Sequence, residues 1–189
     1  LIFSCTKPLA GVGLHQLIES GDAAYDDPIV THWPEFAESG TQKAEITIRQ
    51  VLSHTAGVPY GDFDEAVEEW GDWDAVVAAM EDIDPVYEPG EQPAYHTFNY
   101  GWIVGELIHR ISGQHVDKYV ADHVLDPLGL DHTSIGLDEN EPDDVATLAG
   151  FEVFDRCRDA GEGLGIPAAE SAAVFNQESV HRAVAPSDP

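Results

Sequence analysis

The sequence predicts a mainly α-helical chain, and two observations support this prediction. Apolar residues recur at the three- and four-residue spacing of amphipathic helices, whereas strand-like runs are nearly absent. The expected helices span residues 4–20, 47–54, 63–82, 98–112 and 114–125. A helical layer has to bury its apolar face against a sheet or further helices. The chain is therefore expected to be a helical layer and not a complete α/β protein.

The first helix has the clearest boundaries. Pro8 is tolerated only in the first turn of a helix, which places the start near Ser4. Gly21 stands where a C-terminal cap is expected. Between these points the apolar positions follow helical spacing: Leu9, Val12, Leu14, Leu17 and Ile18.

Turn residues separate the later helices. Asp27-Pro28 breaks the chain after the first helix, and Gly113 fits the C-terminal cap of the fourth. The stretch 88–93, rich in proline and glycine, is expected to be a loop. Because no internal repeat or linker divides the chain, residues 1–189 are predicted to form one domain, whose patterning weakens toward the C-terminus.

The charge balance is strongly acidic. There are 36 Asp and Glu residues against 8 Lys and Arg, a formal net charge of −28. Phosphate binding requires clustered Lys and Arg, so nucleic acid is excluded as a partner. Acidic chains of low hydrophobicity are often disordered, but the 7 Phe, 6 Tyr and 4 Trp residues predict a folded core. Halophilic proteins use charge of this kind, and a salt-adapted protein is expected.

Membrane, redox and metal signals are missing from the sequence. No stretch approaches the roughly 20 apolar residues of a membrane span. No basic-then-apolar signal segment opens the chain, so we expect a cytoplasmic location without membrane association. Cys5 and Cys157 fit neither a disulfide framework nor a zinc-ligand pattern. Cys5 is expected to be a small buried helix residue, and no metal or organic cofactor is predicted.

The tetrapeptide Ser4-Cys5-Thr6-Lys7 contains the first candidate chemistry. Helix positions i and i+3 lie on one face, about 5–6 Å apart at Cβ, so Lys7 can reach the Ser4 hydroxyl. A serine hydroxyl is a weak nucleophile until a neighbouring base activates it. Taken alone, an exposed capping serine beside a solvated lysine is the simpler interpretation, so the weight of this motif depends on the rest of the chain.

The second candidate group is Tyr95-His96-Thr97, directly after the loop 88–93. A tyrosine can serve as a general base when a neighbouring ammonium group stabilises its phenolate. The alternative is a tyrosine that packs on the following helix, with its hydroxyl bonded to backbone or water. The residues alone leave both interpretations open.

Five motifs then occur in a fixed order. They are Ser4-x-x-Lys7, ITIRQVLSHTAG at 46–57, PG at 89–90 before Tyr95, GWIVGE at 101–106 and PLGLDHT at 127–133. This order resembles the serine β-lactamase-like superfamily, which includes class C β-lactamases, D-alanyl-D-alanine peptidases and family VIII carboxylesterases. The resemblance is clearest over 1–135. It implies the helical portion of the β-lactamase/transpeptidase-like α/β fold, with most of the sheet missing and the domain truncated at both ends.

The resemblance assigns roles to individual residues. Ser4 corresponds to the acylated nucleophile, Lys7 to its activating partner and Tyr95 to the tyrosine of the family's Tyr-x-Asn motif. Thr97 stands where that motif has asparagine. The form Tyr-His-x-x-x-x-Gly-Trp is similar to the esterase-like branch, which favours ester over lactam hydrolysis. It implies that His96 and Thr97 bind substrate, a small-molecule ester or amide.

The resemblance also shows what is missing. The family's third motif, a Lys-Thr-Gly or His-x-Gly strand that supplies the second oxyanion N–H, does not follow Tyr95. The Ser4 N–H would then be the only oxyanion donor of the two that the family uses. Because one donor is lost, this chain alone is expected to be weakly active. His54 is expected to cap or pack. A β-lactamase or D-alanyl-D-alanine carboxypeptidase, and a non-catalytic remnant or binding module, remain as alternatives. The oligomeric state is not predicted.

Overall fold

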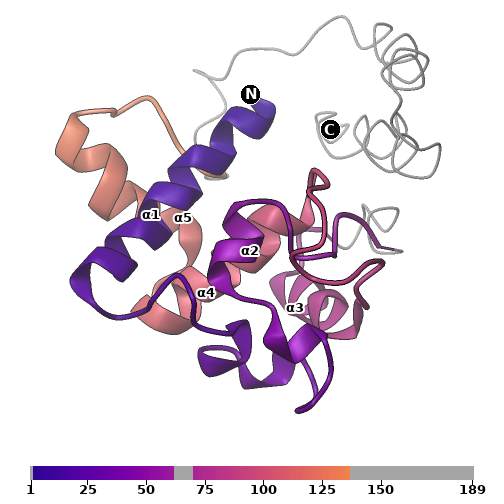
Figure 1. The fold of residues 1–189 in the computed structure, drawn as a ribbon. Coiled ribbons are helices and arrows are strands. Elements are labelled where there is room, and N and C mark those ends of the chain that lie inside the picture. Colours follow the sequence, from indigo (N-terminus) through magenta and orange to yellow (C-terminus); the bar gives the residue numbers. More distant parts are fainter. Residues whose placement is uncertain (1, 62–69, 137–189) are drawn as a thin grey trace, which may run out of the picture.

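The computed structural model describes residues 2–61 and 70–136, which form a helical layer joined by loops and short 3-10 turns (Figure 1). Its helices are α1 (Lys7–Ser20), α2 (Ile48–Leu52), α3 (Trp73–Asp82), α4 (Asn99–Ser112) and α5 (Val116–Val120). The described residues contain no strand, only one isolated antiparallel bridge between Pro28 and Thr47. The prediction of a mainly α chain is therefore confirmed.

Helix α1 follows directly on a 3-10 turn at Phe3–Thr6, so the predicted helix over 4–20 has a tighter first turn than expected. Pro8 lies in the first turn of α1, and Gly21 ends the helix in the left-handed conformation with a φ of 89°. The prediction that Cys5 is buried is wrong, because its side chain is exposed. Cys5 lies in the 3-10 turn, which has no buried residue and precedes the packed part of α1.

The starts of α2 and α3 are set by side-chain caps. The Thr47 hydroxyl accepts from the Gln50 N–H, and the Gln50 amide oxygen accepts from the Thr47 N–H, which is a capping box. Asp72 accepts from two N–H groups in the first turn of α3. Helix α3 therefore begins at Trp73, after a turn, and the prediction of one helix over 63–82 is corrected. Residues 63–69 of that prediction lie outside the described residues.

The predicted helix over 98–112 is confirmed as α4, which Gly113 ends with a φ of 78°. The expected helix over 114–125 changes its hydrogen-bonding pattern along its length. Helix α5 passes into a π-helical turn at Ala121–Leu125 and then a 3-10 turn at Asp126–Leu128. No described helix is long and apolar enough to cross a membrane.

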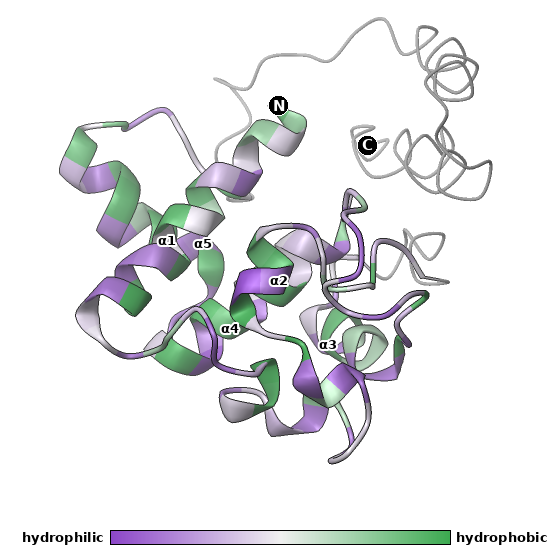
Figure 2. Ribbon diagram, in the orientation of Figure 1, coloured by the Kyte–Doolittle hydropathy of each residue, from purple (hydrophilic) through white to green (hydrophobic). Residues whose placement is uncertain are grey.

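The core is centred on α4, which contacts α1, α2, α3 and α5 (Figure 1). Hydrophobic and hydrophilic positions interleave along α1 and α4 (Figure 2), as expected for helices with one buried face. Glycines in α1 allow the close approach, since a Cβ on Gly11 would lie 2.9 Å from the Tyr100 hydroxyl. The largest fully buried apolar side chains are Trp33, Phe36, Leu14, Ile29, Ile46, Ile48, Met80, Ile103, Leu107, Ile108 and Leu125.

Lys43 is a buried cation that ties a 3-10 turn to the end of α3. Its Nζ donates to the carbonyl oxygens of Met80 at 2.9 Å and Glu81 at 2.6 Å. The ammonium group also lies 4.7 Å from the centroid of the Phe36 ring. Burial lowers the pKa of Lys43 to about 8, although the carboxylates of nearby acidic residues act in the opposite direction. These bonds satisfy carbonyls that a helix C-terminus otherwise leaves unpaired.

Candidate active site

The 3-10 turn before α1 brings Ser4 and Lys7 together. Side chains at i and i+3 eclipse in a 3-10 helix, and Lys7 Nζ lies 3.0 Å from Ser4 Oγ. Ser4 is exposed and Lys7 is partly exposed. The contact that the Ser-x-x-Lys spacing predicts is therefore present in the structure, on a surface that solvent can reach.

A second contact brings in a segment 90 residues away. Lys7 Nζ donates to the carbonyl oxygen of Thr97 at 2.7 Å. The same nitrogen lies 4.8 Å from the centroid of the Tyr95 ring. Ser4, Lys7 and Tyr95 therefore converge at the start of α1, and the Tyr95 side chain is 45% exposed.

Thr97 meets this site through its backbone. Its carbonyl oxygen accepts from Lys7, whereas its Oγ1 is buried without a hydrogen-bond partner among the described residues. Substrate binding by Thr97 stays a prediction, and the structure shows a different contact, the one between its carbonyl and Lys7. Every residue has a backbone carbonyl, so the residue type at position 97 could not predict the bond from Lys7 to this carbonyl.

The ring of His96, which was expected to contact substrate, is instead enclosed in the protein with no exposed surface. Its Nδ1–H donates to the Ala94 carbonyl at 2.6 Å, and its Nε2 accepts from the Val58 N–H at 3.3 Å. Burial lowers the pKa of His96 to about 4, so the ring is neutral near pH 7. Both ring nitrogens are therefore occupied, and the side chain ties the Val58 N–H to the Ala94 carbonyl. This enclosure does not favour substrate contact by His96, which stays a prediction.

His54 lies between these residues, in the turn that ends α2. Its Nδ1 accepts from the His96 N–H at 3.1 Å. Its ring centroid lies 4.8 Å from that of Tyr95 and 5.0 Å from that of Tyr100. Burial, and secondly the charge of Lys7, lower the pKa of His54. The expectation that His54 packs is confirmed, and the structure adds that it packs against the candidate tyrosine.

The backbone beside the site is strained at two points. Phe3 has a φ of 47° and His54 a φ of 60°, and these are the non-glycine residues with positive φ in the described part of the chain. Such conformations cost of order 1–3 kcal/mol for residues other than glycine and often occur at functional sites. One precedes Ser4 directly and the other presents its ring to Tyr95.

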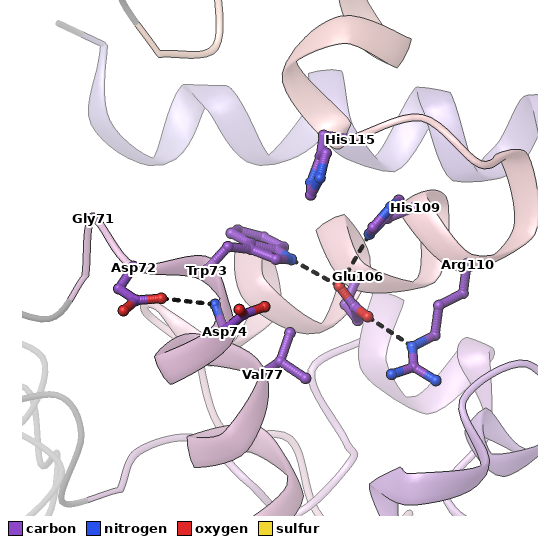
Figure 3. Close-up of a pocket in the computed structure, with 9 residues that line it drawn as sticks. All are labelled: Gly71, Asp72, Trp73, Asp74, Val77, Glu106, His109, Arg110 and His115. Atoms are coloured by element: carbon purple, nitrogen blue, oxygen red, sulfur yellow. Dashed lines mark hydrogen bonds and ion pairs between the residues drawn. The ribbon is translucent and has the colours of Figure 1, made fainter.

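A separate cavity lies between α3, α4 and the start of α5, and none of Ser4, Lys7 and Tyr95 lines it. The buried carboxylate of Glu106 accepts from Trp73 Nε1 at 2.7 Å and from Arg110 Nε at 2.6 Å (Figure 3). Arg110 also pairs with Glu35. These bonds satisfy the carboxylate and join α3 to α4. Across residues 2–61 and 70–136, no group of three or more His, Cys, Asp or Glu side chains could hold a metal ion.

A Ser-x-x-Lys turn opening a helix, with a tyrosine segment folded against it, is the arrangement of the serine β-lactamase-like superfamily. The model of the Beta-lactamase family matches residues 1–175. The chain therefore belongs to this family, and its described residues are the helical portion of that fold.

Several known proteins are similar to this chain. "Esterase/beta-lactamase LipL" of Mycobacterium tuberculosis is 29% identical over 139 residues, which are 72% of this chain and 31% of that protein. A penicillin-binding protein homologue from Caulobacter crescentus is 36% identical with a TM-score of 0.69, covering 78% of this chain and 39% of its own. A family VIII carboxylesterase is 29% identical with a TM-score of 0.63, covering 72% and 37%. The chain thus spans about a third of the length of the relatives it matches.

Proposed function

We propose that this chain carries the acylation centre of a serine hydrolase that cleaves carboxylic esters. The observation that supports this most directly is the 3.0 Å contact between Lys7 Nζ and Ser4 Oγ, with the Tyr95 ring beside the same nitrogen. A nucleophile, its base and an orienting group within hydrogen-bond reach are the geometric signature of an activated serine.

In the proposed reaction, Ser4 Oγ attacks the carbonyl carbon of the ester while its proton passes to the Lys7 amine, the Tyr95 phenolate or both. The alcohol leaves with that proton, and an ester bond now joins the acyl group to Ser4. Water then attacks this acyl-enzyme, releases the carboxylic acid and returns the proton to Ser4. The Ser4 N–H is proposed as one donor to the oxyanion.

The surroundings of Lys7 leave its amine directed at Ser4. Among the described residues, no carboxylate lies within ion-pair distance of Lys7, although Asp and Glu are abundant. The Thr97 carbonyl accepts from Lys7 Nζ at 2.7 Å and so fixes the position of the amine beside Ser4.

Preference for esters is proposed from the residue at position 97 and from the relatives. Thr97 replaces the asparagine of the family's Tyr-x-Asn motif, and its hydroxyl is buried. Two relatives are named an esterase/beta-lactamase and a carboxylesterase. A site without the asparagine amide lacks one group for holding a substrate amide. The sequence therefore supports ester cleavage more than lactam cleavage.

The test is covalent labelling of the full chain by a fluorophosphonate in high salt. Wild-type protein is expected to be labelled at Ser4, and Ser4→Ala to lose the label completely. Ser20→Ala, at the far end of α1, is the matched control and is expected to be labelled normally. Absence of labelling in folded wild-type protein would reject a hydrolytic centre in this chain and favour a non-catalytic remnant.

A β-lactamase or D-alanyl-D-alanine carboxypeptidase is a second candidate, because one relative's name includes β-lactamase and another is a penicillin-binding protein homologue. A fluorescent penicillin distinguishes the two candidates. Labelling of Ser4 by the penicillin at a rate similar to that by the fluorophosphonate would favour the second candidate over the esterase.

Adaptation to high salt is proposed from the net charge of −28. Repulsion of this size destabilises the compact state, and salt screens it, because the Debye length falls from about 10 Å at 0.1 M to about 3 Å at 1 M. The unfolding temperature is expected to rise between 0.1 M and 2 M NaCl. An unfolding temperature that stays constant or falls would contradict salt adaptation.

A further inference from the structure

His54 occupies a backbone position that glycine normally holds. The N–H of His54 bonds to the Val51 carbonyl at 3.0 Å, and the N–H of Thr55 bonds to the Gln50 carbonyl at 2.7 Å. This pair of bonds is the Schellman motif that ends helices, and its left-handed residue is usually glycine. Here that residue is His54, with a φ of 60°.

A left-handed histidine is strained where glycine would be relaxed, so the side chain requires an explanation. The imidazole is half-buried and makes two kinds of contact with the Tyr95–Thr97 segment. Its Nδ1 accepts the His96 N–H, and its ring packs on the Tyr95 ring. The ring also contacts Tyr100, which belongs to α4.

The contacts of His54 involve the same segment, Tyr95–Thr97, that contacts Lys7. Tyr95 lies beside Lys7 Nζ, and the Thr97 carbonyl accepts from the same nitrogen. His96, whose N–H is bonded to His54, is the residue between them. The short segment therefore has one anchor at its centre and both of its contacts with Lys7 at its ends.

We infer that His54 is a positioning residue, which holds Tyr95 and the Thr97 carbonyl against Lys7 through its Nδ1 acceptor and its ring. This inference rests on the proposed function for its catalytic meaning, although the positioning itself can be measured without any reaction. The role inferred for His54 involves no contact with Ser4 and no proton transfer.

The first measurement is by NMR on the full chain. Cross-peaks between the Lys7 methylene protons and the Tyr95 ring protons are expected in the wild type, because Nζ lies 4.8 Å from the ring centroid. His54→Gly relieves the backbone strain and removes both contacts. It is expected to keep an unfolding temperature near the wild-type value and to lose these cross-peaks. Cross-peaks of wild-type intensity in folded His54→Gly would overturn the inference.

A second variant separates the two contacts. Asparagine tolerates the left-handed conformation, and its Oδ1 can accept from the His96 N–H, but it has no ring. His54→Asn is therefore expected to give weakened cross-peaks. Should His54→Gly fail to fold, cross-peaks of wild-type intensity in His54→Asn would overturn the role of the ring. His15→Gln, an exposed histidine on α1 that contacts Tyr25, is the matched control and is expected to change nothing.

Labelling of Ser4 by the fluorophosphonate connects the geometry to function. A misplacement of about 1 Å can cost about 10²-fold in rate, so His54→Gly is expected to slow labelling by about 10²-fold and His54→Asn by less. Unlabelled wild-type protein would reject the proposed function, while the cross-peaks would still decide the positioning role. If His54→Gly loses the cross-peaks but is labelled at the wild-type rate, positioning by His54 does not contribute to the reactivity of Ser4.

Discussion

Lys7 and Lys43 make similar hydrogen bonds in very different surroundings. Both donate to backbone carbonyls, and neither lies within ion-pair distance of a carboxylate among the described residues. Lys43 is buried with two carbonyl partners and an aromatic ring over its charge. Lys7 is partly exposed, and one of its two partners is the hydroxyl of Ser4. We infer from the comparison that Lys43 stabilises the fold, whereas the contact of Lys7 with Ser4 is the one that the proposed acylation requires.

The largest expected effect is on Lys7. Lys7→Met removes the proposed base and should slow fluorophosphonate labelling of Ser4 by about 10²–10⁴-fold, the range of general-base contributions. The unfolding temperature should change little, because the side chain is partly exposed. Lys118→Met, which removes an exposed lysine paired with Asp122, is the control. Equal labelling rates in Lys7→Met and Lys118→Met would contradict the proposed role of Lys7 as the base.

Lys43→Met should show the opposite pattern. The loss of two charge-assisted bonds to α3 should lower the free energy of unfolding by about 1–3 kcal/mol at pH 7. Labelling of the fraction that remains folded should stay within a factor of two of wild type. Chemical denaturation and labelling of the same samples measure both quantities, and slow labelling of folded Lys43→Met would mean that the two regions are coupled.

The pH dependence sharpens this contrast. The pKa of Lys43 is lowered to about 8 in the folded chain from 10.5, so the unfolded chain binds more protons between these values. Stability from this group therefore rises with pH over that window and is lost as the pH falls through 8. The destabilisation by Lys43→Met should accordingly be larger at pH 10 than at pH 7. Equal values at the two pH values would contradict a lowered pKa.

The smallest effect is expected at the contact between α1 and α4. A methyl group on Gly11 would press on the Tyr100 hydroxyl, so Gly11→Ala should cost about 1 kcal/mol, the lower end of the range for overpacking. Gly101→Ala is the matched control, since nothing lies within 4 Å of its added Cβ, and alanine should stabilise the helix by about 0.5–1 kcal/mol. Thermal unfolding of both variants measures the difference. A stabilised Gly11→Ala would show that Tyr100 moves freely and does not support His54.

Much of the fold could be predicted from local sequence signals. Pro8, Gly21 and Gly113 mark helix ends through conformational preferences that act within a few residues, and the structure agrees with them. The start of α3 was misjudged, because the apolar pattern continues through Trp70 and only the Asp72 cap shows where the helix begins. Periodicity identifies a helix but locates its ends poorly.

The site was partly predictable for a different reason. The contact between Ser4 and Lys7 is local, so spacing alone predicts it. The approach of Tyr95 came from a resemblance to a family, because no local signal joins residues about 90 positions apart. The enclosure of His96 could not be predicted, since it depends on the Val58 N–H and the Ala94 carbonyl, which are backbone groups placed by the tertiary fold.

The carboxylate of Glu106 also constrains the order in which the chain can assemble. Its bond to Arg110 spans one turn of α4 and can form as soon as that helix does. Trp73 must arrive from 33 residues upstream, and Glu35 reaches Arg110 across 75 residues. Local contacts form faster than distant ones, since closing a longer loop costs more entropy. On this argument we expect α4 to form early, with α3 and the segment around Glu35 docking onto it later.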